Sequence, residues 1–152
     1  MPTNHTPGTN KSVQKNKDCK TITATIFPEY ERLSFTPQLF GPELMLIGES
    51  LVFDLHNQMT GRSYSGHWEF YKLSNGGFYM APEGNDLLCI TWPGNRFDDV
   101  MSSDAAGIVM SLFALNIMAF EFHNSHLPAM VFKLEDFARG HAESSKIRKA
   151  ID

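Results

Sequence analysis

Apolar residues recur with a period of two near the start of the chain and with a helical period soon after. Residues 21–27, Thr-Ile-Thr-Ala-Thr-Ile-Phe, alternate polar and apolar side chains, which predicts a short strand that Pro28 ends. We expect residues 28–40 to be irregular, because Pro28 and Pro37 interrupt them. A helix is predicted from Gly41-Pro42 to Gly61. Its expected core-facing stripe consists of Leu44, Ile47, Gly48, Leu51, Leu55 and Met59.

Four short runs rich in aromatic and aliphatic residues follow, and a turn signal separates each from the next. The expected strands are residues 67–73, 77–82, 87–92 and 96–101. Turns are predicted at Asn75-Gly76, Glu83-Gly84-Asn85 and Pro93-Gly94-Asn95. The segment Asn75-Gly76-Gly77 should contain at least one residue at positive φ. Because short loops favour antiparallel neighbours, we expect the four strands to form one β-meander.

The last third of the chain is predicted to be helical. Ser102 or Ser103 is the expected N-cap of a long helix, and Asp104 suits its positive end. Pro128 opens a second helix, which Gly140 kinks or ends, and a final helix follows. The order of helix, antiparallel meander and helices predicts a single α+β domain with about four strands and three to four helices.

Charge divides the chain into two parts. Residues 1–20 contain four lysines and one aspartate, and we expect them to form a disordered polar tail. Residues 21–152, the expected single domain, contain nine basic and sixteen acidic residues, a net charge of −7. Imitating duplex DNA across such a domain takes on the order of twenty net negative charges. The domain is therefore too sparsely charged to mimic DNA and too acidic to bind it strongly.

The two cysteines and the most apolar segment both indicate a cytoplasmic protein. Cys19 and Cys89 do not make a disulfide framework, and we expect free thiols in a reducing compartment. Residues 105–122 are largely apolar, but they are slightly short for a membrane span and lack flanking basic residues. A buried core helix is expected there, in a monomeric protein that does not enter a membrane.

One long motif and three shorter ones stand out along the chain. The long motif runs from Gly66 through Trp68 and Phe70-Tyr71 to residues 73–82, Leu-Ser-Asn-Gly-Gly-Phe-Tyr-Met-Ala-Pro. The others lie in residues 32–42, in residues 103–109 (Ser-Asp-Ala-Ala-Gly-Ile-Val) and in residues 137–152. Taken in their order along the chain, the four motifs resemble the ArdB/KlcA antirestriction family. The resemblance implies an α+β protein, encoded on a plasmid or genomic island, that protects incoming DNA from type I restriction enzymes.

The sequence lacks the usual signatures of catalysis, phosphate binding and metal binding. It has no GxGxxG, no GxxxxGK[ST] and no HExxH motif, and His123 and His126 are interpreted as helix-end histidines. We therefore expect no catalytic residue, metal or cofactor. The expected partner is a type I restriction-modification enzyme, reached directly or through a host factor. Two alternatives stay open: a small hydrolase that uses the region of His141 and Glu143, and a nucleic-acid-binding accessory module.

Two polar groups and one hairpin supply candidate contacts with a partner. The segment Arg139-Gly140-His141-Ala142-Glu143 is a capping and salt-bridge cluster, a contact with a partner's acidic group, or an acid–base site. Acidic residues in or beside the predicted turns form either a solvated rim or a patch for a basic partner. The complete set of candidates is Asn75, Tyr79, Glu83, Asp86, Asp98, Asp99, Arg139, His141 and Glu143.

Overall fold

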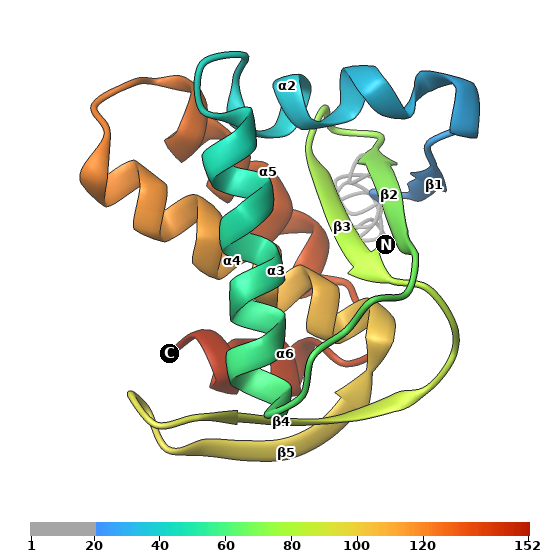
Figure 1. Ribbon diagram of the computed structural model, residues 1–152, viewed down its shortest axis with the longest axis vertical. Coiled ribbons are helices and arrows are strands. Elements are labelled where there is room, and N and C mark those ends of the chain that lie inside the picture. Colours follow the sequence, from blue (N-terminus) through green and yellow to red (C-terminus); the bar gives the residue numbers. More distant parts are fainter. Residues whose placement is uncertain (1–20) are drawn as a thin grey trace, which may run out of the picture.

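Helices surround and separate two small antiparallel sheets (Figure 1). A computed structural model describes residues 21–152, and the predicted tail of residues 1–20 lies outside the described part. The expected α+β class is confirmed. In chain order the elements are strand β1 (Ala24–Ile26), 3-10 helix η1 (Glu29–Ser34), helices α2 (Phe35–Phe40) and α3 (Met45–Thr60), strands β2 (Trp68–Leu73), β3 (Phe78–Pro82), β4 (Leu87–Trp92) and β5 (Phe97–Ser102), and helices α4 (Ser103–Glu121), α5 (His126–Arg139) and α6 (Ser144–Ile151).

The first sheet has the strand order β1-β2-β3 and is built around the long motif. Tyr71 on β2 lies opposite Tyr79 on β3. Gly76 in the connecting turn has φ +91°, which confirms the predicted positive φ. The Asn75 side chain accepts a hydrogen bond from the Gly77 N–H at 3.0 Å. The turn is thus fixed by local chemistry, which is why the sequence alone predicts it.

The predicted four-stranded meander is wrong, because β4 pairs with β5 in a separate sheet and not with β3. The side chain of Ser111 on α4 occupies the edge of β3 that β4 was expected to fill. Its Oγ accepts from the Met80 N–H and donates to the Met80 carbonyl, both at 3.2 Å. The backbone groups at this edge are therefore satisfied by a helix side chain. The loop 83–86 then carries the chain away to the second sheet.

Residues 29–40 are also helical, where residues 28–40 were predicted to be irregular. Pro37 lies in the first turn of α2, where a backbone N–H has no partner within the helix, so the ring is tolerated. Phe35, Leu39 and Phe40 of this helix are fully buried. Tertiary burial of these three residues explains why the segment folds as a helix despite its prolines.

Helix α3 ends at Gly61 as predicted, with φ +71°, but it begins at Met45 and not at Pro42. Its buried face is rotated from the predicted stripe: Ile47 is 48% exposed and Leu51 is half-buried. The rotation places Gly48 against the Phe40 ring, where a β-carbon would lie 2.3 Å from the ring. The buried residues are Gly48, Val52, Leu55, His56 and Met59.

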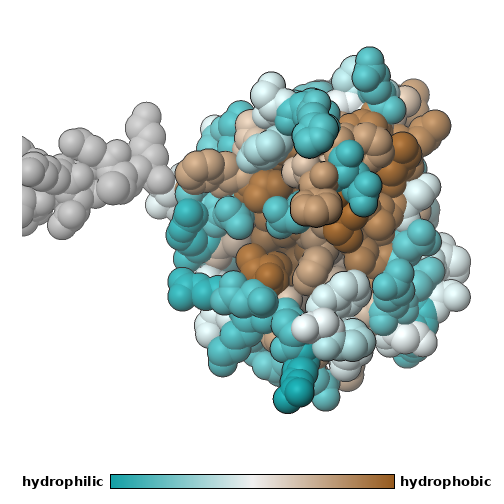
Figure 2. Space-filling model, turned by 90° about the vertical axis from the view of Figure 1, so that its left-hand side faces the viewer, coloured by the Kyte–Doolittle hydropathy of each residue, from teal (hydrophilic) through white to brown (hydrophobic). Residues whose placement is uncertain are grey.

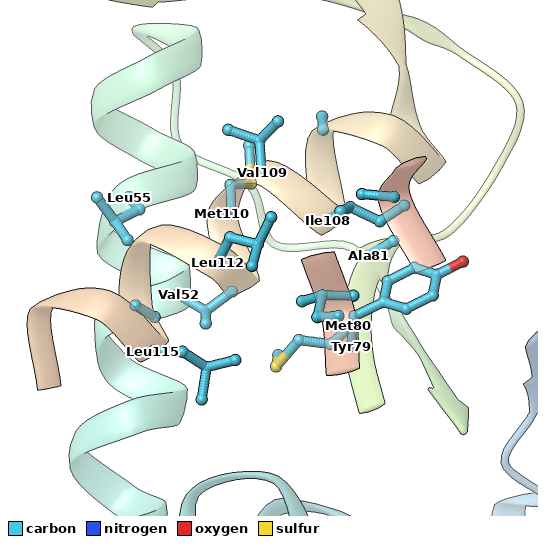
Figure 3. Close-up of a cluster of buried hydrophobic side chains, with 14 of the residues drawn as sticks. Val52, Leu55, Tyr79, Met80, Ala81, Ile108, Val109, Met110, Leu112 and Leu115 are labelled. Atoms are coloured by element: carbon cyan, nitrogen blue, oxygen red, sulfur yellow. The ribbon is translucent and has the colours of Figure 1, made fainter. Parts of the chain in front are cut away.

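Helix α4 forms the centre of the core, where it packs against β3 on one side and α3 on another. Figure 3 shows Leu112 and Leu115 of α4 among Val52 and Leu55 of α3. A β-carbon at Gly107 would lie 2.3 Å from the Ala81 Cβ, so α4 and β3 are in backbone-close contact. The helix is long and apolar enough to cross a membrane, but most of its residues are buried within the domain. It is therefore a core helix, as expected.

Candidate functional site

Segments far apart in the sequence meet at the first turn of α4. Ser102 is its N-cap, and its side chain accepts from the Ala105 N–H at 3.1 Å. The Ser103 N–H and hydroxyl both donate to the Asp86 carbonyl, at 3.1 and 3.0 Å, which holds the loop 83–86 beside the helix. Strand β3 and the segment 137–143 reach the same place through side chains. Three of the four motif segments therefore converge here.

Asp104 is the hub of this convergence. One of its carboxylate oxygens accepts from the Tyr79 hydroxyl at 2.6 Å, and the other accepts from His141 Nε2 at 2.8 Å. We call these three residues the Asp104 cluster. Burial acts to raise the pKa of Asp104, but the hydrogen bonds from His141 and Tyr79 outweigh it and leave the pKa below 3.8. The positive end of α4 also favours the carboxylate.

His141 is held with both ring nitrogens occupied. The Glu143 N–H donates to Nδ1 at 3.0 Å, so Nδ1 is an acceptor and carries no hydrogen. The hydrogen therefore lies on Nε2 and points at Asp104. This arrangement fixes the tautomer and leaves no free nitrogen in the ring for a substrate.

Tyr79 is a core residue, with 1% of its surface exposed. Its ring is stacked between Tyr71, at a centroid distance of 4.7 Å, and Phe137, at 5.7 Å. Burial raises the pKa of Tyr79 strongly, and its hydrogen bond to Asp104 and the negative charge there raise it further. The hydroxyl thus stays protonated as a donor. Burial leaves the ring no surface for direct contact with a partner.

Glu143 joins the C-terminal segment to the same helix end. Its Oε1 accepts from the Ser102 N–H at 3.0 Å, and its Oε2 accepts a short hydrogen bond from the Ser102 hydroxyl. His141 and Glu143 both bind the first turn of α4, and Gly140 ends α5 just before them. In this geometry the pair acts as a clamp between α4 and the C-terminal helices.

Arg139 takes no part in this clamp. Its side chain is 57% exposed and pairs with Asp136 one turn earlier, at 2.7 Å. It also lines a cleft of about 260 Å³ between α5 and α6, together with Arg148 and Ser144. Arg139 is therefore available to a partner in a way that His141 and Glu143 are not.

The remaining candidates divide between internal and exposed positions. The Asn75 amide donates to the Lys133 carbonyl at 2.9 Å, which ties the hairpin turn to α5. Glu83, Asp86, Asp98 and Asp99 are exposed. Asp99 lies 3.8 Å from Lys146 of α6. These acidic residues lie on two elements: Asp98 and Asp99 are on β5, and Glu83 and Asp86 are in the loop before β4.

A second charged group was not predicted from the sequence. Glu69 on β2 lies 3.7 Å from Arg32, whose guanidinium sits over the Phe70 ring at 5.3 Å. Burial raises the pKa of Glu69, and its hydrogen bond with Glu83 raises it further. Arg32 belongs to the first motif segment, so this group fixes η1 to the first sheet.

The arrangement offers little for catalysis or metal binding. A nucleophile–histidine pair needs a free ring nitrogen beside a hydroxyl or thiol, and both nitrogens of His141 are bonded within the chain. Within residues 21–152, no three His, Cys, Asp or Glu side chains come together as metal ligands. The cluster is suited to holding elements together.

Sequence reasoning identified Ser102 and Asp104 only as helix-start residues and missed the role of Asp104 as hub. The available signal was that Tyr79, Asp104 and His141 each lie within a different motif segment. Residues that are distant in sequence but belong to separate motifs are candidates for one spatial cluster.

Comparison with known proteins gives consistent matches. A family model described as "Antirestriction protein" matches residues 62–152. Two proteins named "Antirestriction protein KlcA", both from Escherichia coli, are 45% and 40% identical to this chain. Their alignments cover 86% and 90% of this chain, and 94% and 99% of those proteins. A "Putative antirestriction protein YubI" of E. coli K12 is 37% identical over 64% of this chain and 67% of its own length.

A solved structure is also similar, with a TM-score of 0.77 and 40% sequence identity. It covers 89% of this chain and 99% of its own. That work describes the KlcA and ArdB proteins as having a novel fold and antirestriction activity against type I DNA restriction systems in vivo but not in vitro.

Proposed function

Because the chain belongs to the antirestriction protein family, we propose that it protects incoming mobile DNA by inhibiting type I restriction-modification enzymes. In this proposal inhibition proceeds through protein contacts and not by imitation of DNA. The observation that carries it is the match, along almost the whole chain, to relatives with that activity. The protein acts in the bacterial cytoplasm and is not an enzyme.

Charge supports contact over mimicry. Residues 21–152 have a net charge of −7, whereas a DNA mimic of this size needs on the order of twenty. The same negative balance opposes binding to phosphate groups. In this proposal the protein binds the surface of the restriction enzyme directly, or it binds a host protein that the enzyme requires.

The rigid frame in this proposal is the Asp104 cluster with the Glu143–Ser102 clamp. It holds α5 and α6 against α4, and so presents Arg139 and the cleft beside it in a fixed position. Arg139 is the contact residue that we favour beside this frame, because arginine is enriched at the hot spots of protein interfaces. Exposed Glu83, Asp86, Asp98 and Asp99 are proposed as further contacts with a basic surface.

Residues 21–61 belong to the proposed antirestriction domain, although the family model begins at residue 62. They contribute β1 to the first sheet, and α2 and α3 supply buried core residues such as Phe40 and Val52. The domain therefore needs them for its core.

The decisive experiment is carried out in cells, since the relatives' activity is described in vivo only. We expect expression of the chain to raise the plating efficiency of unmodified phage on cells with a type I system. Cells that lack the restriction subunit control for effects on phage growth. Unchanged plating efficiency, with the protein confirmed as soluble and abundant, would refute the proposal.

A second experiment tests the mechanism. Protein shortened to residues 21–152 should show no micromolar binding to duplex DNA at physiological salt, because its net charge repels phosphate. A gel-shift or anisotropy titration measures this. Micromolar binding that weakens steeply with salt would favour the nucleic-acid-binding alternative.

A further inference from the structure

Large apolar side chains are exposed on α3 and on the C-terminal half of α4. Figure 2 looks at the side of the molecule that lies on the left in Figure 1, and apolar surface is gathered across its centre and upper part. Leu46 is 72% exposed, Ile47 48%, Ile117 37% and Phe120 86%. We call these four residues the α3–α4 face.

The exposed apolar residues follow the helical repeat on α4 and line a groove on α3. On α4, half-buried Phe113 precedes Ile117 and Phe120 at helical spacing, and the Phe113 ring lies 4.9 Å from Trp92 of β4. On α3, Leu46 and Ile47 line a shallow groove with Ser50, Leu51 and Asp54. The two helices pack directly on one another, and apolar surface is gathered on the side of the domain that Figure 2 shows.

The exposed apolar area is that of an interface. A large aromatic side chain such as Phe120 has about 150–250 Å² to bury and an aliphatic one less, so the four residues together expose on the order of 400 Å². One side of a standard protein interface has about 800 Å², of which about 450 Å² is non-polar. The α3–α4 face thus exposes nearly as much apolar area as one side of such an interface.

The charged residues on the two helices of this face, and next to them in sequence, have one sign. Residues 43–61 contain Glu43, Glu49 and Asp54 and neither lysine nor arginine, and residues 105–124 contain Glu121 as their one charged residue. A two-fold pairing of identical chains would bring this acidic rim against itself, which disfavours a second copy as the occupant. The same rim repels nucleic acid and anionic lipid headgroups.

We infer that the α3–α4 face binds a protein partner whose contact surface has an apolar centre and a rim of lysine and arginine. The inference rests on the proposed function and deepens it, because it assigns the main contact to a surface other than Arg139 and the acidic turns. Proteins that handle DNA carry basic surfaces of this kind. The apolar centre supplies affinity, and the acidic rim directs the approach of a basic partner.

The first test uses exposed positions, so that the fold is preserved. The double variant Leu46→Ser/Phe120→Ser should lose at least about tenfold of the protection measured by phage plating, equivalent to about 1.4 kcal/mol of binding. The matched control is Tyr30→Ser/Leu33→Ser on η1, on the opposite side of the domain, where the two side chains are 86% and 95% exposed. It should protect as the unaltered chain does. Equal protection by both double variants, with equal melting temperatures, would overturn the inference.

A second variant covers the case in which the first one misfolds. Asp54→Lys reverses an exposed charge of the rim, and Glu29→Lys makes the same change on η1. We expect a severalfold loss of protection for Asp54→Lys and none for Glu29→Lys. If the two variants protect equally well, the proposed role of the acidic rim is overturned.

The third test does not depend on protection. A photoreactive amino acid at position 47 is activated in cells with a type I system, and the attached peptide is sequenced. We expect a peptide of another protein with lysine or arginine beside apolar residues, and no such adduct from a photoreactive amino acid at position 33. An adduct between two copies of this chain, or with lipid, would overturn the inference. If the unaltered chain gives no protection, the proposed function fails whatever is cross-linked. If the unaltered chain protects and the variants protect equally well, the docking face alone fails.

Discussion

Replacing Asp104 with asparagine tests whether the Asp104 cluster holds the domain together. The carboxylate accepts two hydrogen bonds, from Tyr79 and His141. An asparagine accepts on one side only and presents an NH₂ group on the other. If its oxygen faces His141, the Tyr79 hydroxyl hydrogen loses its acceptor. If its oxygen faces Tyr79, the NH₂ group meets the Nε2–H of His141, whose other tautomer is disfavoured by the Glu143 N–H.

The magnitude follows from the geometry. A hydrogen bond to a charged group contributes about 1.5–3 kcal/mol, and the 39% exposure of the Asp104 side chain indicates the lower end. Loss of the negative charge at the start of α4 adds about 0.3–1 kcal/mol. Asp104→Asn should therefore lower the free energy of unfolding by about 2 kcal/mol at pH 7. For a domain of this size the melting temperature should fall by about 4–8 °C.

Urea unfolding at pH 7, 5 and 3 measures the effect and its pH dependence. The pKa of Asp104 is lowered in the folded chain from 3.8, so its contribution is fully present above pH 3.8 and is lost as the pH falls through the lower folded value. The difference between the original chain and Asp104→Asn should be present at pH 5 and narrow towards pH 3 and below. The control Asp98→Asn changes an exposed carboxylate of β5 and should shift stability by under about 0.5 kcal/mol.

A double-mutant cycle with Tyr79→Phe isolates the hydrogen bond. Tyr79→Phe should cost about 1–2 kcal/mol in the original chain and clearly less when residue 104 is asparagine, because the lost partner is shared. Fully additive effects, or a stability difference that persists unchanged below pH 3, would refute the reasoning.

Three other predictions address the turn, the core and the surface. Gly76→Val places a β-carbon at φ +91° and should cost about 1–2 kcal/mol in urea unfolding, and an unchanged midpoint would contradict a left-handed turn. Gly107→Ala puts a β-carbon 2.3 Å from the Ala81 Cβ, so it should cost about 3 kcal/mol or more, measured by calorimetry; tolerance would mean that α4 and β3 separate easily. Arg139→Ala should reduce phage protection while the melting temperature moves by less than about 4 °C, since exposed ion pairs contribute under about 1 kcal/mol. Asp136→Ala removes the same ion pair and is the control. If both variants reduce protection equally, the loss is explained by the ion pair, and Arg139 is not a contact with the partner.

Features fixed by local chemistry could be predicted from the sequence. The Asn75-Gly76 turn, the Ser102 cap and the ends of helices at Gly61 and Gly140 each depend on a residue's own backbone preference. Strand boundaries between residues 67 and 102 were predicted within one residue for the same reason. These signals need no knowledge of what packs against them.

Features decided by tertiary contacts could not be predicted in this way. The phase of α3 depends on the Phe40 ring against Gly48, and the split into two sheets depends on Ser111 binding the edge of β3. The Asp104 cluster joins residues that are 25 and 37 positions apart. Its members were visible in the motifs, but only the fold shows which one is the hub.

The composition of α4 is best explained by two demands on the same helix. A helix that serves only a core carries polar residues on its remaining exposed face. Gly107 and Ser111 serve the core, through close contact with β3, yet the exposed positions further along include Ile117 and Phe120. Burial of most of the helix removes the need for a membrane to explain its hydropathy, but it does not explain apolar residues that remain on the surface. The protein partner proposed for that surface would account for them, and this demand is independent of the one that shapes the Asp104 cluster at the other end of the helix.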